Sequence, residues 1–176
     1  SGEKQSEALA HYTKLNEQRM KRLDKTVQLS TELQNDLDQI PGPWIWLVIT
    51  EAWCGDAAQN IPVMAQAVQH QPFIEMELIL RDEHPEIMDR YTDHGSRGIP
   101  KLVCFRKEDQ KELGMWGPRP APAQKMVIGN KEANHPKPYS ELAEDLQKWY
   151  AQDKTATMQS ELSAHIRQWT RRHLSA

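Results

Sequence analysis

The chain has 176 residues, of which 38% are hydrophobic and 27% are charged, and its formal net charge is −3. This length suits one domain with room for extensions. A nucleic-acid-binding protein is expected to carry a basic face, whereas neither sign of charge is concentrated in a block here. No apolar run approaches the roughly 20 residues of a membrane span. We therefore expect neither nucleic acid nor a membrane as a partner.

The sequence contains two cysteines, which do not form a disulfide framework in a chain of this length. No signal-peptide core is recognisable. We therefore expect a cytoplasmic protein with reduced thiols. None of the seven histidines has zinc-ligand spacing with a cysteine, so we expect no metal site.

The region before residue 44 predicts an N-terminal helical extension, residues 1–43. Residues 3–40 are rich in Glu, Lys, Gln and Leu, and their apolar residues recur at roughly helical spacing, which predicts one or two amphipathic helices. The "PGP" at 41–43 ends this region, because proline does not continue a helix and restricts the residue before it.

The middle of the chain, residues 44–133, predicts a core of alternating strands and helices. Strand–helix–strand followed by a hairpin gives a central mixed sheet with helices on both faces, an α/β fold. The expected elements are a strand at 44–50, a helix at 55–69 with Pro62 inside it, a strand at 73–81, a helix at 84–91, a strand at 101–105, a weaker strand at 111–116 and a helix that begins near 119.

Residues 134–176 predict a C-terminal helical extension that packs on the core, so that the whole chain forms one domain. The loop at 134–138 leads into a long polar helical segment, with Ser140 as the expected N-cap. Packing within the chain, a dimer surface and a helix of a partner protein are all open as roles for the two extensions.

Cys54 falls where a buried strand ends and a helix begins. The first turn of a helix offers unpaired N–H groups and the positive end of its dipole, and both favour a thiolate. Gly55 permits close backbone approach, whereas the carboxylate of Asp56 disfavours a neighbouring thiolate. The net direction of the Cys54 pKa shift stays open.

Three features in order carry a resemblance: "WCG" at 53–55, a proline eight positions after the cysteine at Pro62, and "GIP" at 98–100 before the next strand. Together they resemble the thioredoxin superfamily, over roughly residues 44–130. The segments "ITEAWCGDAAQNIP", "RDEHPEIMDRY" and "WGPRPAP" are similar to poorly characterised bacterial thioredoxin-like proteins with a single-cysteine WCGDA motif.

The resemblance implies a thioredoxin-like fold in which Cys54 is the nucleophile. It further implies that Pro62 kinks the helix and that the bond between Ile99 and Pro100 is cis, faces the thiol and leaves a backbone edge on which substrates dock. Trp53 is expected to shape the surface around the thiol.

Two departures from the family pattern matter for function. Ala57 stands where the resolving cysteine would be, and Val48 replaces the buried carboxylate that helps to deprotonate it. Cys104 lies four residues beyond Pro100, roughly 13 Å along the strand at about 3.3 Å per residue, too far for a disulfide with Cys54. We expect Cys104 to be a small buried hydrophobe, and a dithiol mechanism is improbable.

The hairpin after Pro100 is expected to bring its far end beside Cys54. There Trp116 would wall the site, and Arg119 or Arg97 would stabilise a thiolate or hold an acidic ligand such as glutathione. The alternative is that Trp116 packs and both arginines are solvated. His94 is expected to be a surface loop residue.

Three hypotheses of function follow. The first is a monothiol redox protein, in which Cys54 forms a mixed disulfide with a protein or small-molecule disulfide and an external thiol such as glutathione resolves it. The second is a non-catalytic thioredoxin-fold binding or scaffold module that recognises a protein partner through the cis-proline edge and the helical extensions. The third is a peroxide or electrophile sensor oxidised at Cys54. Whether the chain is an enzyme stays open, and apart from glutathione as a co-substrate no cofactor is expected.

Overall fold

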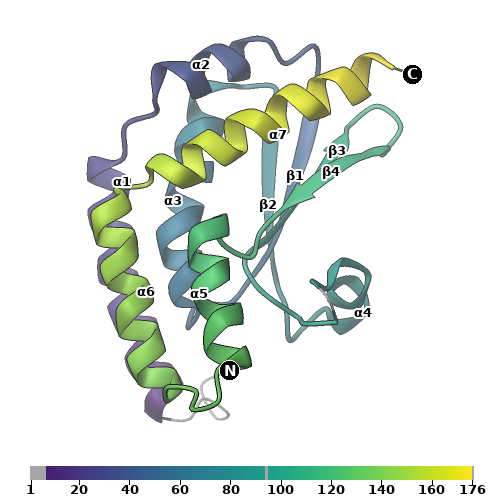
Figure 1. The fold of residues 1–176 in the computed structure, drawn as a ribbon. Helices are drawn as coiled ribbons and strands as arrows, with labels where there is room; N and C mark the ends of the chain where they lie inside the picture. The colour runs from purple at the N-terminus through teal and green to yellow at the C-terminus, as the bar shows by residue number, and fades with distance from the viewer. Residues whose placement is uncertain (1–6, 94, 176) are drawn as a thin grey trace.

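The computed structural model describes residues 7–93 and 95–175. Its centre is a four-stranded mixed sheet with strand order β2-β1-β3-β4 (Figure 1). β1 pairs with β2 in parallel, and the β1–β3 and β3–β4 pairs are antiparallel. The strands are β1 (Trp44–Thr50), β2 (Ile74–Leu80), β3 (Lys101–Arg106) and β4 (Glu112–Trp116). The predicted mixed sheet is confirmed, and the strand bounds differ from the expected ones by at most one residue at each end.

Helices lie on both sides of this sheet. α3 (Gly55–His70) connects β1 to β2, and α5 (Ala121–Glu132) follows β4. The helix expected at 84–91 is broken into a four-residue helix, α4 (Pro85–Met88), and a 3-10 turn at Asp89–Tyr91. α4 stands apart from the other helices in Figure 1. The expected α/β fold with helices on both faces is confirmed.

The extensions form four helices. α1 (Glu7–Thr26) and α2 (Thr31–Asp38) precede the sheet, and α6 (Tyr139–Asp153) and α7 (Ala156–Leu174) end the chain. None of the helices described is both long and apolar enough to span a bilayer.

The expected N-cap at Ser140 is wrong. α6 begins one residue earlier, at Tyr139, and Pro138 is its N-cap residue. The Pro138 carbonyl accepts the N–H groups of Glu141 and Leu142, both at 3.1 Å. Ser140 therefore lies inside the first turn, because the extended backbone of Pro138 already leads directly into the helix.

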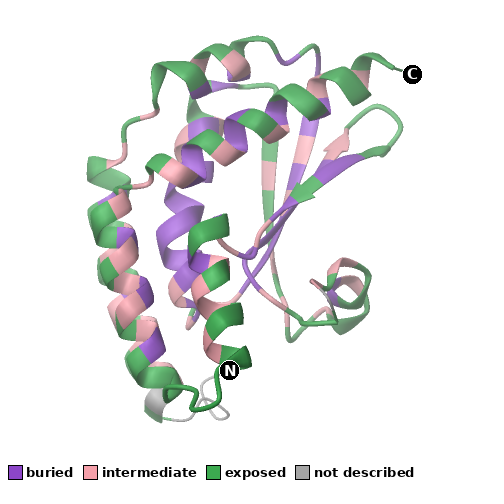
Figure 2. Cartoon of the chain, viewed as in Figure 1, coloured by how far each residue is buried: buried purple, intermediate pink, exposed green. Residues whose placement is uncertain are grey.

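The hydrophobic core joins the extensions to the sheet. Trp44 and Trp46 of β1 are fully buried, and the Trp169 ring of α7 meets them edge to face at centroid distances of 6.3 and 6.4 Å. Leu33 and Leu37 of α2 belong to the same cluster. Figure 2 shows buried positions along α3 and on the inner side of α7. Both extensions therefore contribute to the core of the sheet.

Candidate functional site

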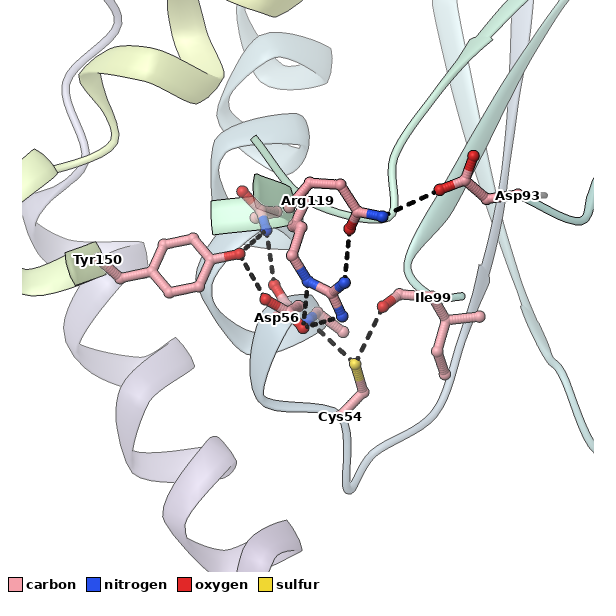
Figure 3. A network of polar contacts seen from close by, with 9 residues as sticks. Cys54, Asp56, Asp93, Ile99, Arg119 and Tyr150 are labelled. Carbon is pink, nitrogen blue, oxygen red and sulfur yellow. Dashed lines mark hydrogen bonds and ion pairs between the residues drawn. The ribbon is translucent and has the colours of Figure 1, made fainter. Parts of the chain in front are cut away.

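Cys54 is the N-cap residue of α3, directly after the turn that leaves β1. Its Sγ accepts the backbone N–H of Ala57 at 3.4 Å and donates to the carbonyl of Ile99 at 3.3 Å (Figure 3). The peptide bond between Ile99 and Pro100 is cis. The helix start and the Ile-Pro segment therefore meet at the sulfur.

The Cys54 thiol is held in its protonated form. Cys54 is 8% exposed. This burial is the larger cause, and the nearby Asp56 carboxylate the smaller one, of a Cys54 pKa raised to about 12. The N–H groups of Ala57 and Asp56 and the charge of Arg119 act in the opposite direction but do not outweigh them. The direction of the Cys54 pKa shift, which the sequence left open, is therefore upward.

Asp56 is enclosed by two partners. Arg119 donates to its Oδ2 from Nε at 3.0 Å and from Nη2 at 2.8 Å, and the Tyr150 hydroxyl donates to its Oδ1 at 2.7 Å. The side chains of Arg119 and Asp56 are 15% and 11% exposed. Burial alone would lower the pKa of Arg119, but the Asp56 carboxylate outweighs it and raises that pKa. Arg119 therefore binds the Asp56 carboxylate, and this carboxylate disfavours the Cys54 thiolate.

The same network extends away from the sulfur. Arg119 Nη1 donates to Gln124 at 2.6 Å, and Gln124 donates to Asp93 at 3.2 Å. Asn60 donates to the Tyr150 hydroxyl at 3.0 Å. Figure 3 shows Tyr150 and Arg119 on Asp56 and the network continuing from Arg119 to Asp93.

Two other residues expected near Cys54, Arg97 and Trp116, have partners of their own. Arg97 is ion-paired with Asp89 through Nε at 2.7 Å and Nη2 at 2.8 Å. Trp116 is 4% exposed and donates to Glu161 at 2.8 Å, so of the two alternatives it packs in the core and does not wall the site. His94 lies outside the described residues.

A cleft of roughly 600 Å³ opens over the sulfur. Its walls come from the turn that carries Trp53, Cys54 and Gly55, from the segment before Pro100 and from the extension helices α1 and α6. The turn packs closely there, because a Cβ on Gly55 would lie 3.0 Å from the side-chain amide of Gln147 on α6. The expected close approach at Gly55 is therefore to a side chain of the C-terminal extension.

The sequence reasoning missed Arg19 of α1 as part of this cleft. Its Nη1 lies 3.7 Å from the position of a Cβ on Gly55. The only available signal was the helical periodicity of α1, which predicts a helix without indicating which of its polar residues meets the turn at 53–55.

A family model described as thioredoxin matches residues 2–154. The chain belongs to the thioredoxin family. A search of curated proteins found no significant match. Among solved structures, the chain is similar to a protein of unknown function from Pseudomonas aeruginosa, with a TM-score of 0.64, 19% identity and 90% of each chain covered. It is also similar to an HIV epitope scaffold, with a TM-score of 0.62, 18% identity and 90% of each chain covered. These likenesses concern the fold.

Relative to the dithiol pattern of the thioredoxin family, the site lacks a second thiol. Ala57 and Val48 are both buried in the core cluster. Cys104 is fully buried, as predicted, and pairs across the sheet with Trp46 of β1 and Gly114 of β4. Both cysteines are free thiols. Among the residues that the structure describes, no cluster of His, Cys, Asp or Glu could hold a metal ion.

Proposed function

We propose that this thioredoxin-family protein is a non-catalytic binding module whose ligand enters the cleft over Cys54. The observation that carries the proposal is the protonated sulfur, which donates to Ile99 and has a pKa raised to about 12 by burial and by Asp56. At pH 7 a thiol with that pKa is ionised in about one molecule in 10⁵. Because the thiolate is the nucleophile, Cys54 acts as part of the cleft wall.

The lack of a resolving group supports the same proposal. Ala57 supplies a backbone N–H to the sulfur but no thiol. Cys104 lies in the middle of β3, paired with residues of β1 and β4. An adduct formed on Cys54 would have no second thiol within the described site to release it.

The architecture around the sulfur favours binding. The cleft volume lies within the range of about 300–1,000 Å³ of small-molecule sites. α1 and α6, which belong to the extensions, line it together with the segment before Pro100. The two extensions are therefore used to build a binding wall that the sheet and α3 alone would lack.

A monothiol redox role is the second candidate, and one observation favours it. Sγ lines the cleft and accepts the N–H of Ala57 at the helix start, which is where a thiolate would be stabilised. In that role the Cys54 thiolate attacks one sulfur of a disulfide, the S–S bond breaks and the other sulfur leaves as a thiolate. A glutathione thiolate then attacks the new mixed disulfide and releases Cys54. A peroxide sensor would need the same thiolate.

Turnover of a glutathionylated peptide in excess glutathione tests the proposal. We expect the wild type and Cys54→Ser to give the same rate, equal to that without protein. Circular dichroism would verify that both are folded. A rate that the wild type raises and Cys54→Ser does not would reject the binding module and establish the monothiol mechanism.

A further inference from the structure

The lining of the cleft over Cys54 contains more basic than acidic side chains, although the chain as a whole carries a formal net charge of −3. Two of its lining residues are carboxylates, and five carry a permanent positive charge. The carboxylates are Asp56 and Glu144, and the cations are Arg19, Arg81, Arg97, Arg119 and Lys148. Which of these cations is left for a ligand depends on their acidic partners.

Three of the arginines are already neutralised. Arg81 pairs with Asp82 at 2.8 Å, while Arg97 and Arg119 pair with Asp89 and Asp56. They shape the cleft but have little charge left for a ligand.

Arg19 differs from these three. Among the described residues, no carboxylate lies within ion-pair distance of it, and the hydrogen bond that its Nη1 makes is to the amide oxygen of Asn16, at 2.8 Å. The Arg19 side chain is half-buried, and this burial, followed by the charge of Arg22, lowers the pKa of Arg19. Arg19 is thus a partly desolvated cation that faces the cleft and has no acidic partner in the described part of the chain.

Asn16 fixes the position of this cation. It is 2% exposed, and its side-chain amide donates to the carbonyl of Ala52 at 3.0 Å. The same side chain therefore ties α1 to the turn before Cys54 and holds Arg19 through its oxygen. A donor held in place before a ligand arrives loses little entropy on binding.

The rest of the cleft offers apolar surface to the body of a ligand. Three aromatic side chains, Tyr12, Trp53 and Tyr139, line it. Trp53 is further held by the Arg81 guanidinium, 4.9 Å from its ring centroid. Aromatic walls with a few placed polar groups are typical of sites for small organic ligands.

We propose that the cleft binds a small organic anion, with its acidic group on Arg19 beside the Cys54 turn and its apolar body among Tyr12, Trp53 and Tyr139. This inference rests on the proposed binding function and adds the chemical class of the ligand. Arginine suits this task because its guanidinium presents several N–H donors in a plane that matches carboxylate, sulfonate or phosphate oxygens.

Fluorescence titration with two probes that share one aromatic framework tests the proposal. The probes are anilinonaphthalene sulfonate, which is an organic anion, and phenylnaphthylamine, which lacks the charge. Arg19→Gln removes the proposed contact. Arg22→Gln is the matched control, because Arg22 lies on the same helix and carries the same charge but is exposed and does not line the cleft.

We expect Arg19→Gln to weaken binding of the sulfonate by about tenfold, since one charge-assisted contact is lost in a partly solvated cleft. Arg22→Gln should change it by less than about twofold, and binding of the neutral probe should be the same in all three proteins. Circular dichroism would check that both variants are folded.

Several results would overturn the proposal: no sulfonate binding to the wild type, equal binding to the wild type and Arg19→Gln, or equal losses in both variants. Equal binding to wild type and Arg19→Gln would place the probe elsewhere, for example on the exposed apolar side chains Leu78 and Met115 of the sheet. The turnover assay with Cys54→Ser is independent of this titration, so failure of the ligand class and failure of the non-catalytic function give different results.

Discussion

At the scale of single residues, the chemistry of Cys54 depends on neighbours that lie far away in the sequence. Its position at a helix start was predictable from the order of a buried strand, "WCG" and a helix. The enclosure of Asp56 was not, because Arg119 and Tyr150 lie 63 and 94 residues further along the chain. Arg119 does act to lower the pKa of Cys54, as expected of it, but it is also bound to the Asp56 carboxylate, which raises that pKa. Which acid an arginine pairs with is decided by tertiary packing, which periodicity does not reveal.

Replacing Cys54 by serine should change how the stability of the protein depends on pH. The folded-state pKa of about 12 lies above the unfolded value of 9.0. The unfolded thiol therefore loses its proton first, and the stability from the protonated thiol is complete below pH 9 and is lost as the pH rises from 9 toward 12. Cys54→Ser lacks this titration.

Urea denaturation of both proteins between pH 7 and pH 10.5 measures this difference. Up to about pH 9 we expect a constant difference between the two free energies of unfolding. Above pH 9 the free energy of unfolding of the wild type should fall relative to that of the variant, with a slope that approaches about 1.4 kcal/mol per pH unit. A difference that stays constant through pH 10.5 would contradict a raised pKa at Cys54.

At the scale of elements, α6 is tied to α3 by two polar side chains: Gln147 accepts a hydrogen bond from Gln59 at 2.8 Å, and the Tyr150 hydroxyl reaches the site itself. Tyr150 donates to Asp56 and accepts from Asn60, so it joins the C-terminal extension to the first turns of α3. The segment after the loop at 134–138 predicted a helix that packs on the core. It did not reveal this polar contact, because helical periodicity does not show which acid a tyrosine hydroxyl meets.

Tyr150→Phe should destabilise the protein by about 1–3 kcal/mol, because Asp56 loses a donor in a buried position. The control is Tyr139→Phe on the same helix, which should cost less than about 0.5 kcal/mol because its side chain is exposed. Urea denaturation at pH 7 measures both. Equal effects of the two substitutions would show that the Tyr150 hydroxyl does not secure α6 to the site.

At the scale of the whole molecule, the two extensions share one core with the sheet. The element order from 44 to 133 was predictable because each strand and helix carries its own pattern of apolar residues and its own punctuation by proline or glycine. The packing of α7 against the sheet was not predictable. It depends on Gly114 of β4, which has no side chain and so leaves room for Trp169 of α7. A Cβ there would lie 2.2 Å from Nε1 of Trp169.

Gly114→Ala should therefore destabilise the protein strongly, by about 3 kcal/mol or more, because backbone at φ +153° and the Trp169 ring both exclude a methyl group. Gly129→Ala is the matched control. Gly129 lies inside α5, and apart from its own stretch of helix no described atom lies within 4 Å of its Cβ position, so the substitution should stabilise the protein by about 0.5–1 kcal/mol through helix propensity. Thermal unfolding measures the change in stability of both variants. A Gly114→Ala variant as stable as the wild type would mean that α7 does not pack on β4.

The most direct test is the rate at which iodoacetamide alkylates Cys54 as a function of pH, followed by mass spectrometry of the peptide that contains it. A thiol whose pKa is raised to about 12 should react at pH 7 about 1,000-fold more slowly than a free thiol, and its rate should keep rising through pH 10 without a plateau. A plateau below pH 8.5, or a rate at pH 7 that exceeds that of a free thiol, would show that Cys54 is an activated nucleophile and would contradict the binding role proposed for the cleft.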